Sequence, residues 1–320
     1  LGIFFMLLLA GAVCAEDSGK PLTYRHFEST EADGRVVSMT PVPVKSVPRW
    51  ARDVSQEPFD WTKQTSEKPF FAKLIPFVLP PTDEGEAFYH HNHQPSITWL
   101  PNGDLLAIWY STRSEYGLVM TVVASRLRPG SKAWDPSSEF FKAPQCNMTG
   151  SSIFHDGRGT IYHFNGMAPK GVTNWKKLAL LMRTSKDNGV TWTRPRAVDD
   201  LYTTRHQVIS GMFMTKTGVL IQNCDAVPGG HGGTALHISP DGGKTWTDPG
   251  KGRPAPEFTE GGKGKGTIAG IHAKVAELND GRLLAFGRGD TIDGKMPMSI
   301  SSDLGQTWTY KASPFPPNGG

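Results

Sequence analysis

Residue types that can transfer protons or bind anions gather in two segments that flank a predicted β-hairpin (96–110). The first segment, YHHNHQP (89–95), is rich in histidine, and the second, YSTRSEY (110–116), combines tyrosine, arginine and glutamate. Histidine and carboxylate side chains act as general acids and bases, tyrosine can act as an acid or a nucleophile, and arginine binds carboxylates through two parallel hydrogen bonds. Four residues of these segments are therefore candidates for acid–base or anion-binding chemistry: His93, Tyr110, Arg113 and Glu115.

The elements that must position these residues repeat along the chain. The segments SKDNGVTW (185–192), SPDGGKTW (239–246) and SSDLGQTW (301–308) all fit the pattern S-x-D-x-G-x-T-W, and SRLRPGSKAW (125–134) is a degraded copy. Internal repeats at this spacing are typical of repeat architectures. Because Asp and Gly stabilise tight turns through local backbone contacts, we interpret each box as a folding device rather than as a catalytic site.

Each box follows the same series of predicted strands. An apolar run, an Asn/Asp/Gly turn and a second apolar run form a hairpin, and a third run leads into the box. These third strands are predicted at 118–125, 178–185, 234–239 and 296–301. The hairpin strands are predicted at 96–100 and 105–110, 150–155 and 160–164, 207–214 and 219–223, and 273–278 and 282–286. The box tryptophans are 58, 54 and 62 residues apart. Four short antiparallel strands in each repeat predict the blade of an all-β propeller.

The boxes resemble the Asp-boxes, or BNR repeats, of the sialidase (neuraminidase) superfamily, over roughly residues 93–310. The resemblance implies a propeller of four-stranded blades, six in number in sialidases. About four blades are visible here, so we expect a truncated chain whose propeller occupies residues 91–320. Residues 16–90 are interpreted as an N-terminal extension that could supply a ring-closing strand, with strands expected at 36–39 and 77–79.

Propeller topology then selects further candidate residues. The start of each innermost strand and the end of the second strand are expected on the same face of the disc, around its axis. Polar residues that map to these places in the third and fourth blades are Arg205, His206, Asp225, His272, Arg288 and Asp290. We assign Asp225 a catalytic role, and we assign the other five, together with Arg113, to substrate binding.

The resemblance implies a chemistry as well as a fold. Sialidases hold the substrate carboxylate with three arginines, the first within an R-I-P motif, and use a tyrosine nucleophile, a glutamate and an aspartate. Here the matching tripeptide is His93-Gln94-Pro95, and a neutral histidine does not replace a permanently charged guanidinium. We therefore expect a glycoside hydrolase-like enzyme that acts on an anionic glycan but is not a true sialidase, with His93, Tyr110, Glu115 and Asp225 as its catalytic residues.

Two alternatives stay open. A polysaccharide lyase acting on uronic-acid glycans would use an arginine to neutralise the carboxylate, and histidine and tyrosine to remove and deliver protons. A propeller that binds glycans or proteins without catalysis is the other alternative, because a fold does not determine a function.

The N-terminus predicts export. Residues 1–15 (LGIFFMLLLAGAVCA) form an uncharged run that ends in a small-residue cleavage pattern and is too short to span a bilayer. Since no basic segment precedes this run, we expect an incomplete signal peptide, a secreted or periplasmic protein, and no membrane insertion after cleavage. Cys146 and Cys224 would then remain, either as a disulfide or as two buried thiols.

Composition and charge narrow the range of partners. The chain has 34 Lys and Arg against 30 Asp and Glu, a net charge of +4 that is spread without long basic runs. This balance gives no support to nucleic-acid binding, so a glycan is the expected partner. Because no Cys/His spacing resembles a zinc cluster, we assign no cofactor and no metal ligand. Whether the His-rich segments hold a divalent ion stays open.

Overall fold

The structure, a computed structural model, describes residues 26–42, 46–64, 74–209 and 211–317. The predicted signal peptide lies outside these ranges. In the described ranges, no helix has the length and apolar character needed to cross a membrane.

The described chain folds into four antiparallel sheets, each matching one sequence repeat. The first sheet contains β3 (His91–Trp99), β4 (Leu105–Thr112), β5 (Thr121–Leu127) and β6 (Ser138–Phe141). The second contains β7 (Ser151–His155), β8 (Ile161–Met167), β9 (Leu178–Ser185) and β10 (Arg196–Thr203). The third contains β11 (Phe213–Met214), β12 (Leu220–Asp225), β13 (Thr234–Ser239) and β15 (Thr267–Ile268). The fourth contains β16 (Ile271–Glu277), β17 (Leu283–Arg288), β18 (Pro297–Ser301) and β19 (Thr307–Ala312), with β14 (Lys263–Lys265) at its edge.

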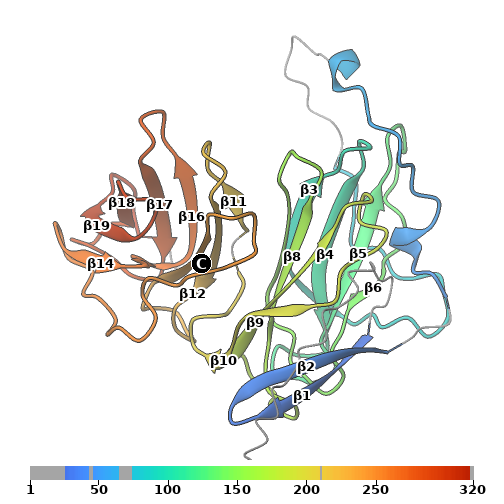
Figure 1. Cartoon of the computed structure of the whole chain (residues 1–320), viewed down its shortest axis with the longest axis horizontal. Coiled ribbons are helices and arrows are strands. Elements are labelled where there is room, and N and C mark those ends of the chain that lie inside the picture. The colour runs from blue at the N-terminus through green and yellow to red at the C-terminus, as the bar shows by residue number, and fades with distance from the viewer. Residues whose placement is uncertain (1–25, 43–45, 65–73, 210, 318–320) are drawn as a thin grey trace, which may run out of the picture.

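The prediction of an all-β fold with four-stranded blades is confirmed. The sheets of β3–β9 and of β11–β19 lie side by side in Figure 1. Side-chain hydrogen bonds join neighbouring blades near their inner strands. Ser96 on β3 accepts the amide proton of Ile153 on β7 (3.0 Å), and Ser152 on β7 donates to Gln222 on β12 (2.8 Å).

The three complete boxes have the same internal hydrogen bonds, as expected for a folding device. In the first box, the Ser185 hydroxyl donates to Asp187 (2.8 Å), and Asp187 accepts the amide proton of Thr191 (2.9 Å). The Trp192 indole donates to the Gly189 carbonyl (3.1 Å). The second and third boxes repeat this pattern around Trp246 and Trp308. The hydrogen bonds within each box therefore hold the turn in place between the two strands that it connects.

The N-terminal segment lies outside the ring of inner strands. β1 (His26–Ala32) and β2 (Arg35–Val42) form a hairpin, and β2 joins the outer edge of the second blade where Arg35 pairs with Leu201 of β10. The described N-terminal residues therefore supply an outer strand of the second blade, and no ring-closing strand is found among them. Residues 77–79 form no strand, and Phe77 instead packs on Trp109 at a ring distance of 5.3 Å.

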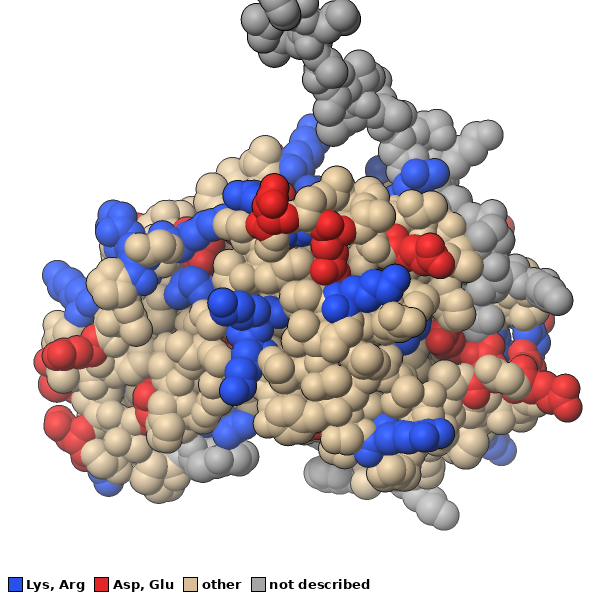
Figure 2. Space-filling view, turned by 90° about the horizontal axis from the view of Figure 1, so that it is seen from below, with Lys and Arg blue, Asp and Glu red and all other residues tan. Residues whose placement is uncertain are grey.

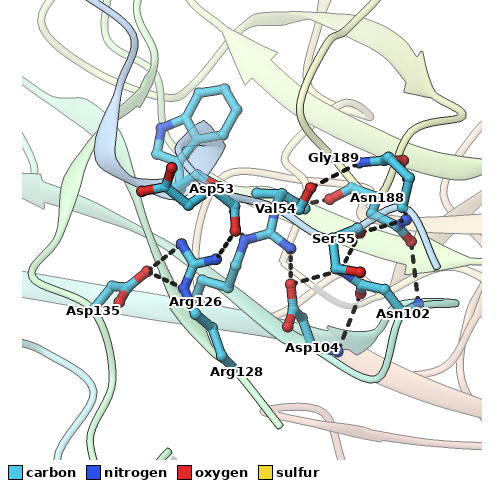
Figure 3. A network of polar contacts seen from close by, with 12 residues as sticks. Asp53, Val54, Ser55, Asn102, Asp104, Arg126, Arg128, Asp135, Asn188 and Gly189 are labelled. Atoms are coloured by element: carbon cyan, nitrogen blue, oxygen red, sulfur yellow. Dashed lines mark hydrogen bonds and ion pairs between the residues drawn. The ribbon is translucent and has the colours of Figure 1, made fainter. Parts of the chain in front are cut away.

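A buried polar network fastens the remainder of this segment, which includes the short helices η1 (Arg49–Ala51) and η2 (Trp61–Gln64), to the first two blades (Figure 3). The Arg126 guanidinium on β5 forms an ion pair with Asp104 (2.6 Å) and donates to the carbonyls of Trp50 (2.9 Å) and Asn188 (2.8 Å). Trp50 belongs to the N-terminal segment, and Asn188 lies in the first box. One fully buried side chain thus holds three parts of the chain together.

Charged side chains are interspersed with uncharged residues on the face shown in Figure 2.

Cys146 and Cys224 are both buried free thiols, so the prediction of two buried thiols, rather than a disulfide, is correct.

Candidate functional site at the converging strand ends

A cavity of about 200 Å³ opens where the ends of inner strands from the four blades converge. Its lining includes six residues that the sequence analysis selected or placed in this region: His93, Tyr110, Glu115, Asp225, His272 and Arg288. A larger hollow of about 610 Å³ is lined by residues that include Asp199, His237 and Lys251. We favour the smaller cavity as the functional site, because the first, third and fourth blades all contribute ionisable side chains to it.

The first blade contributes a compact cluster of three groups. His93 on β3 pairs in register with Tyr110 on β4, and Glu115 lies on the loop that follows β4. The Tyr110 hydroxyl donates to Glu115 Oε1 (2.8 Å), and His93 Nδ1 lies 2.9 Å from the same oxygen. His93 Nδ1 is also 3.0 Å from the Tyr110 hydroxyl. Any proton shared by these groups can therefore move between them over one hydrogen bond.

A local distortion of β3 places this cluster. The register between β3 and β4 shifts between His93 and Ser96, and Gln94 adopts a left-handed backbone conformation (φ 54°). β-Bulges of this kind redirect neighbouring side chains and are frequent beside active sites. The Gln94 side chain lines the cavity, and its buried Oε1 atom has no hydrogen-bond partner among the described residues.

Burial and hydrogen bonds give Tyr110 and Glu115 different protonation states. Burial and the hydrogen bond to Glu115 raise the pKa of Tyr110, so its phenol stays protonated at neutral pH. Burial alone would raise the pKa of Glu115, but hydrogen bonds from Tyr110 and His93 outweigh it and lower the pKa. Glu115 is therefore an ionised proton acceptor beside a neutral phenol.

The third and fourth blades contribute a second chain of polar contacts. His272 Nε2 lies 3.0 Å from Asp225 Oδ2, and the backbone amide of His272 donates to Asp225 Oδ1 (2.8 Å). Arg288 Nε donates to His272 Nδ1 (3.0 Å). Because Nδ1 accepts this hydrogen bond, we assign the imidazole proton to Nε2. Both carboxylate oxygens of the buried Asp225 thus contact His272, so Asp225 is placed to orient this histidine, and its predicted catalytic role stays a prediction.

Two of the predicted substrate-binding residues, Arg205 and His206, lie outside the cavity lining. Arg205 binds Asp248 through two nitrogens (2.5 and 2.8 Å), and the buried His206 places Nδ1 2.8 Å from the Leu178 carbonyl oxygen. Their predicted placement at the cavity was wrong because the inner strand expected at 207–214 is confined to β11 (Phe213–Met214). In the connecting segment, Gln207 and Ile209 line the cavity instead.

The remaining two candidates lie outside the cavity lining. Arg113 is exposed, with its guanidinium carbon 5.6 Å from the centre of the Tyr89 ring. Asp290 accepts the amide proton of Gly232 (2.9 Å) and lies 3.7 Å from His231. Asp290 therefore holds the loop that contains Gly229 and Gly230, two of the lining residues, without lining the cavity itself.

Two supporting residues were missed by the sequence analysis. Trp175 lines the cavity from the loop between β8 and β9 and packs against Tyr116, with ring centres 4.4 Å apart. The buried Asn147 amide donates to the carbonyls of Glu115 (2.7 Å), Gly117 (3.2 Å) and Thr173 (3.1 Å). Asn147 thereby fixes the loop that carries Glu115. The tryptophan in the polar segment GVTNWKK was the available sequence signal for a functional loop.

A propeller with Asp-boxes at its strand turns and a polar cavity at the converging strand ends defines the class of this protein. Residues 103–318 match the BNR repeat-like domain, and the chain belongs to this family within the sialidase/BNR-repeat superfamily. No curated protein matches the chain at a significant level.

Solved structures share the fold at low sequence identity. The NanB sialidase from Streptococcus pneumoniae superposes with a TM-score of 0.54 and 13% identity, over 75% of this chain and 54% of NanB. A protein of unknown function from Dyadobacter fermentans gives a TM-score of 0.51 and 17% identity, over 75% of this chain and 72% of that one. The matched region thus spans about half the length of the sialidase.

Proposed function

We propose that this protein is a carbohydrate-active enzyme, exported from the cell, that hydrolyses a glycosidic bond of an anionic glycan in the cavity between the strand ends. One observation carries the proposal: a neutral phenol, an ionised carboxylate and an arginine line the same cavity. Membership of the BNR repeat-like family and the fold shared with a sialidase support the choice of glycan substrates.

In this proposal, Tyr110 is the nucleophile and Glu115 its base. The phenol oxygen attacks the anomeric carbon while its proton passes to Glu115 over the 2.8 Å hydrogen bond, and the bond to the leaving oxygen breaks. Water then releases the sugar from Tyr110. A neutral nucleophile suits an anionic sugar, because it avoids the repulsion that a carboxylate nucleophile would meet.

Two further residues complete the proposed mechanism. His93 is half-exposed, and its Nε2 has no hydrogen-bond partner among the described residues. In its doubly protonated form, His93 would protonate the leaving oxygen from Nε2 and keep its Nδ1 proton on Glu115. Arg288 binds the substrate carboxylate, oriented by its contact with His272. Since His93 stands where sialidases carry an arginine, the proposed substrate is an anionic glycan other than a sialoside.

A uronate-specific lyase is the second candidate. The distance of 3.0 Å between His93 Nδ1 and the Tyr110 hydroxyl favours it, because such a pair could remove the C5 proton and protonate the leaving oxygen. Arg288 would then neutralise the carboxylate that acidifies the C5 proton. The two candidates use the same residues but give different products.

Product analysis distinguishes the two candidates. The protein would be incubated with a panel of uronic-acid polysaccharides and sialosides, with reducing ends, free sialic acid and the ultraviolet absorbance of unsaturated uronates measured in parallel. Hydrolysis predicts new reducing ends without that absorbance, whereas elimination gives both. Glu115→Gln should abolish turnover, and Glu257→Gln, at an exposed glutamate outside the cavity, should not. If every substrate is inert, the enzyme proposal fails and glycan-array binding tests the non-catalytic alternative.

A further inference from the structure

Three potential metal ligands converge at the side of the cavity formed by the first blade. His91 and His93 point to the same face of β3 because alternate residues of a strand do so, and Glu115 approaches them from the following loop. One nitrogen of each histidine and one carboxylate oxygen all lie within 4.8 Å of one another. We propose that His91, His93 and Glu115 bind a divalent cation of the zinc type. This inference does not rest on the proposed function.

An unsatisfied buried atom independently supports a ligand at this point. His91 Nε2 is buried and has no hydrogen-bond partner among the described residues. Glu115 Oε1 lies 3.5 Å from this nitrogen, which is long for a hydrogen bond. The His91 ring stacks on Tyr110, with ring centres 6.0 Å apart and planes at 15°, so its orientation is held by packing. A buried polar atom without a partner is costly, and a cation would pair it.

The spacing of the ligand atoms fits a small cation. Zinc binds histidine nitrogen and carboxylate oxygen at about 2.0–2.2 Å, so ligands arranged as a tetrahedron lie roughly 3.3–3.6 Å apart. In this structure, Glu115 Oε1 is 2.9 Å from His93 Nδ1 and 3.5 Å from His91 Nε2. A slight opening of the His93–Glu115 contact, with loss of the proton between the two groups, would admit the cation.

The donor set determines the class of cation. Two imidazoles and one carboxylate suit zinc and related transition metals, whereas calcium and magnesium prefer oxygen ligands. The Tyr110 hydroxyl, 2.8 Å from Glu115 Oε1 and 3.0 Å from His93 Nδ1, borders the fourth position. Cation binding would therefore compete with Tyr110 for the Glu115 carboxylate. Glu115 would therefore be available as a base for Tyr110 in the metal-free form of the protein but not in the metal-bound form.

Metal titration of the full chain tests this inference without any glycan. After treatment with a chelator and its removal, the protein would be titrated with Co²⁺ under visible absorbance and with Zn²⁺ by calorimetry. We expect one ion per chain and the intense visible bands of four-coordinate cobalt, which Zn²⁺ should displace. Ca²⁺ or Mg²⁺ at the same concentration should give no binding.

Matched histidine variants locate the ion. His91→Ala should weaken zinc binding by about tenfold or more. His231→Ala, at a largely exposed histidine outside the cluster, should leave binding unchanged. Circular dichroism would establish that each variant is folded, and His93→Ala serves as the second test if His91→Ala does not fold. Absence of stoichiometric binding to the wild-type chain, or binding unaffected in both folded ligand variants, overturns the inference. Because metal binding and glycan turnover are measured separately, the failure of either proposal leaves the other standing.

Discussion

Tyr110 and Glu115 show how a few contacts assign a proton. The phenol is buried and donates to Glu115, so its pKa rises, whereas two hydrogen bonds lower the pKa of the carboxylate despite its partial burial. The sequence placed both residues near the same strand end, but it could not show that they touch. Their contact depends on the pairing of β4 with β3 and on the loop held by Asn147.

Removing the Tyr110 hydroxyl tests its proposed role. Tyr110→Phe keeps the buried ring but loses the nucleophile, so we expect kcat on the active glycan to fall by about a hundredfold or more, with a small change in KM. Steady-state kinetics on the best substrate of the panel would measure both constants. Tyr116→Phe, at an exposed tyrosine, is the matched control. Nearly unchanged turnover by Tyr110→Phe would refute a chemical role for the hydroxyl.

A second residue-scale prediction concerns stability and pH. Burial and the neighbouring charge of His237 lower the pKa of His206 to about 4. The unfolded chain therefore binds more protons than the folded chain between the folded pKa and the ordinary value near 6.5, and stability falls as the pH decreases through this window. The slope contributed by His206 is at most about 1.4 kcal/mol per pH unit.

His206→Asn removes this titration and retains a side-chain donor for the Leu178 carbonyl. We expect the free energy of unfolding of the variant to depend less steeply on pH, as measured by urea denaturation at pH about 7 and about 5. His231→Asn, at an exposed histidine, should keep the wild-type slope. An unchanged slope in His206→Asn would show that this histidine does not set the acid sensitivity.

At the scale of the elements, the box motif carried most of the predictive information. The strands 178–185 and 234–239 begin and end at the predicted residues, because each runs directly into a box whose turn fixes its end. The inner strand of the third blade was overestimated, since of the predicted run 207–214 only Phe213–Met214 form a strand among the described residues. Arg205 and His206 were misplaced as a result, whereas His272 and Arg288, on well-formed strands of the fourth blade, were placed correctly beside the cavity.

The box tryptophans should differ in their contribution to stability. Trp192 is 1% exposed and packs edge-on against Phe140 at 5.2 Å, whereas Trp246 is only partly buried. We expect Trp192→Ala to lower the free energy of unfolding by about 3–5 kcal/mol, and Trp246→Ala to lower it by less. Urea denaturation of both variants gives the comparison. Equal losses would mean that the box turn, rather than indole burial, governs the contribution of each tryptophan.

At the scale of the whole molecule, the N-terminal segment is an outer brace of the first two blades. The sequence identified residues 16–90 as irregular, but it could not predict where they dock, because the docking depends on buried polar pairs from distant parts of the chain. The hairpin β1–β2 extends the second blade, and the carbonyl of Trp50 accepts a hydrogen bond from Arg126. The cavity-lining strands of the first blade are thus backed by chain outside the repeats.

Arg126→Met tests whether this brace depends on one side chain. The substitution leaves Asp104 buried without its ion-pair partner (Figure 3), and breaking such pairs costs about 3–5 kcal/mol. We expect a loss of this size in urea denaturation and faster proteolysis near Trp50, whose carbonyl accepts a hydrogen bond from Arg126. Arg35→Met, which removes the exposed ion pair between the N-terminal segment and Asp200, should cost about 1 kcal/mol or less. A similar loss in both variants would show that the N-terminal segment is held by many weak surface contacts, whereas a large loss in Arg126→Met alone would locate the brace at the buried ion pair.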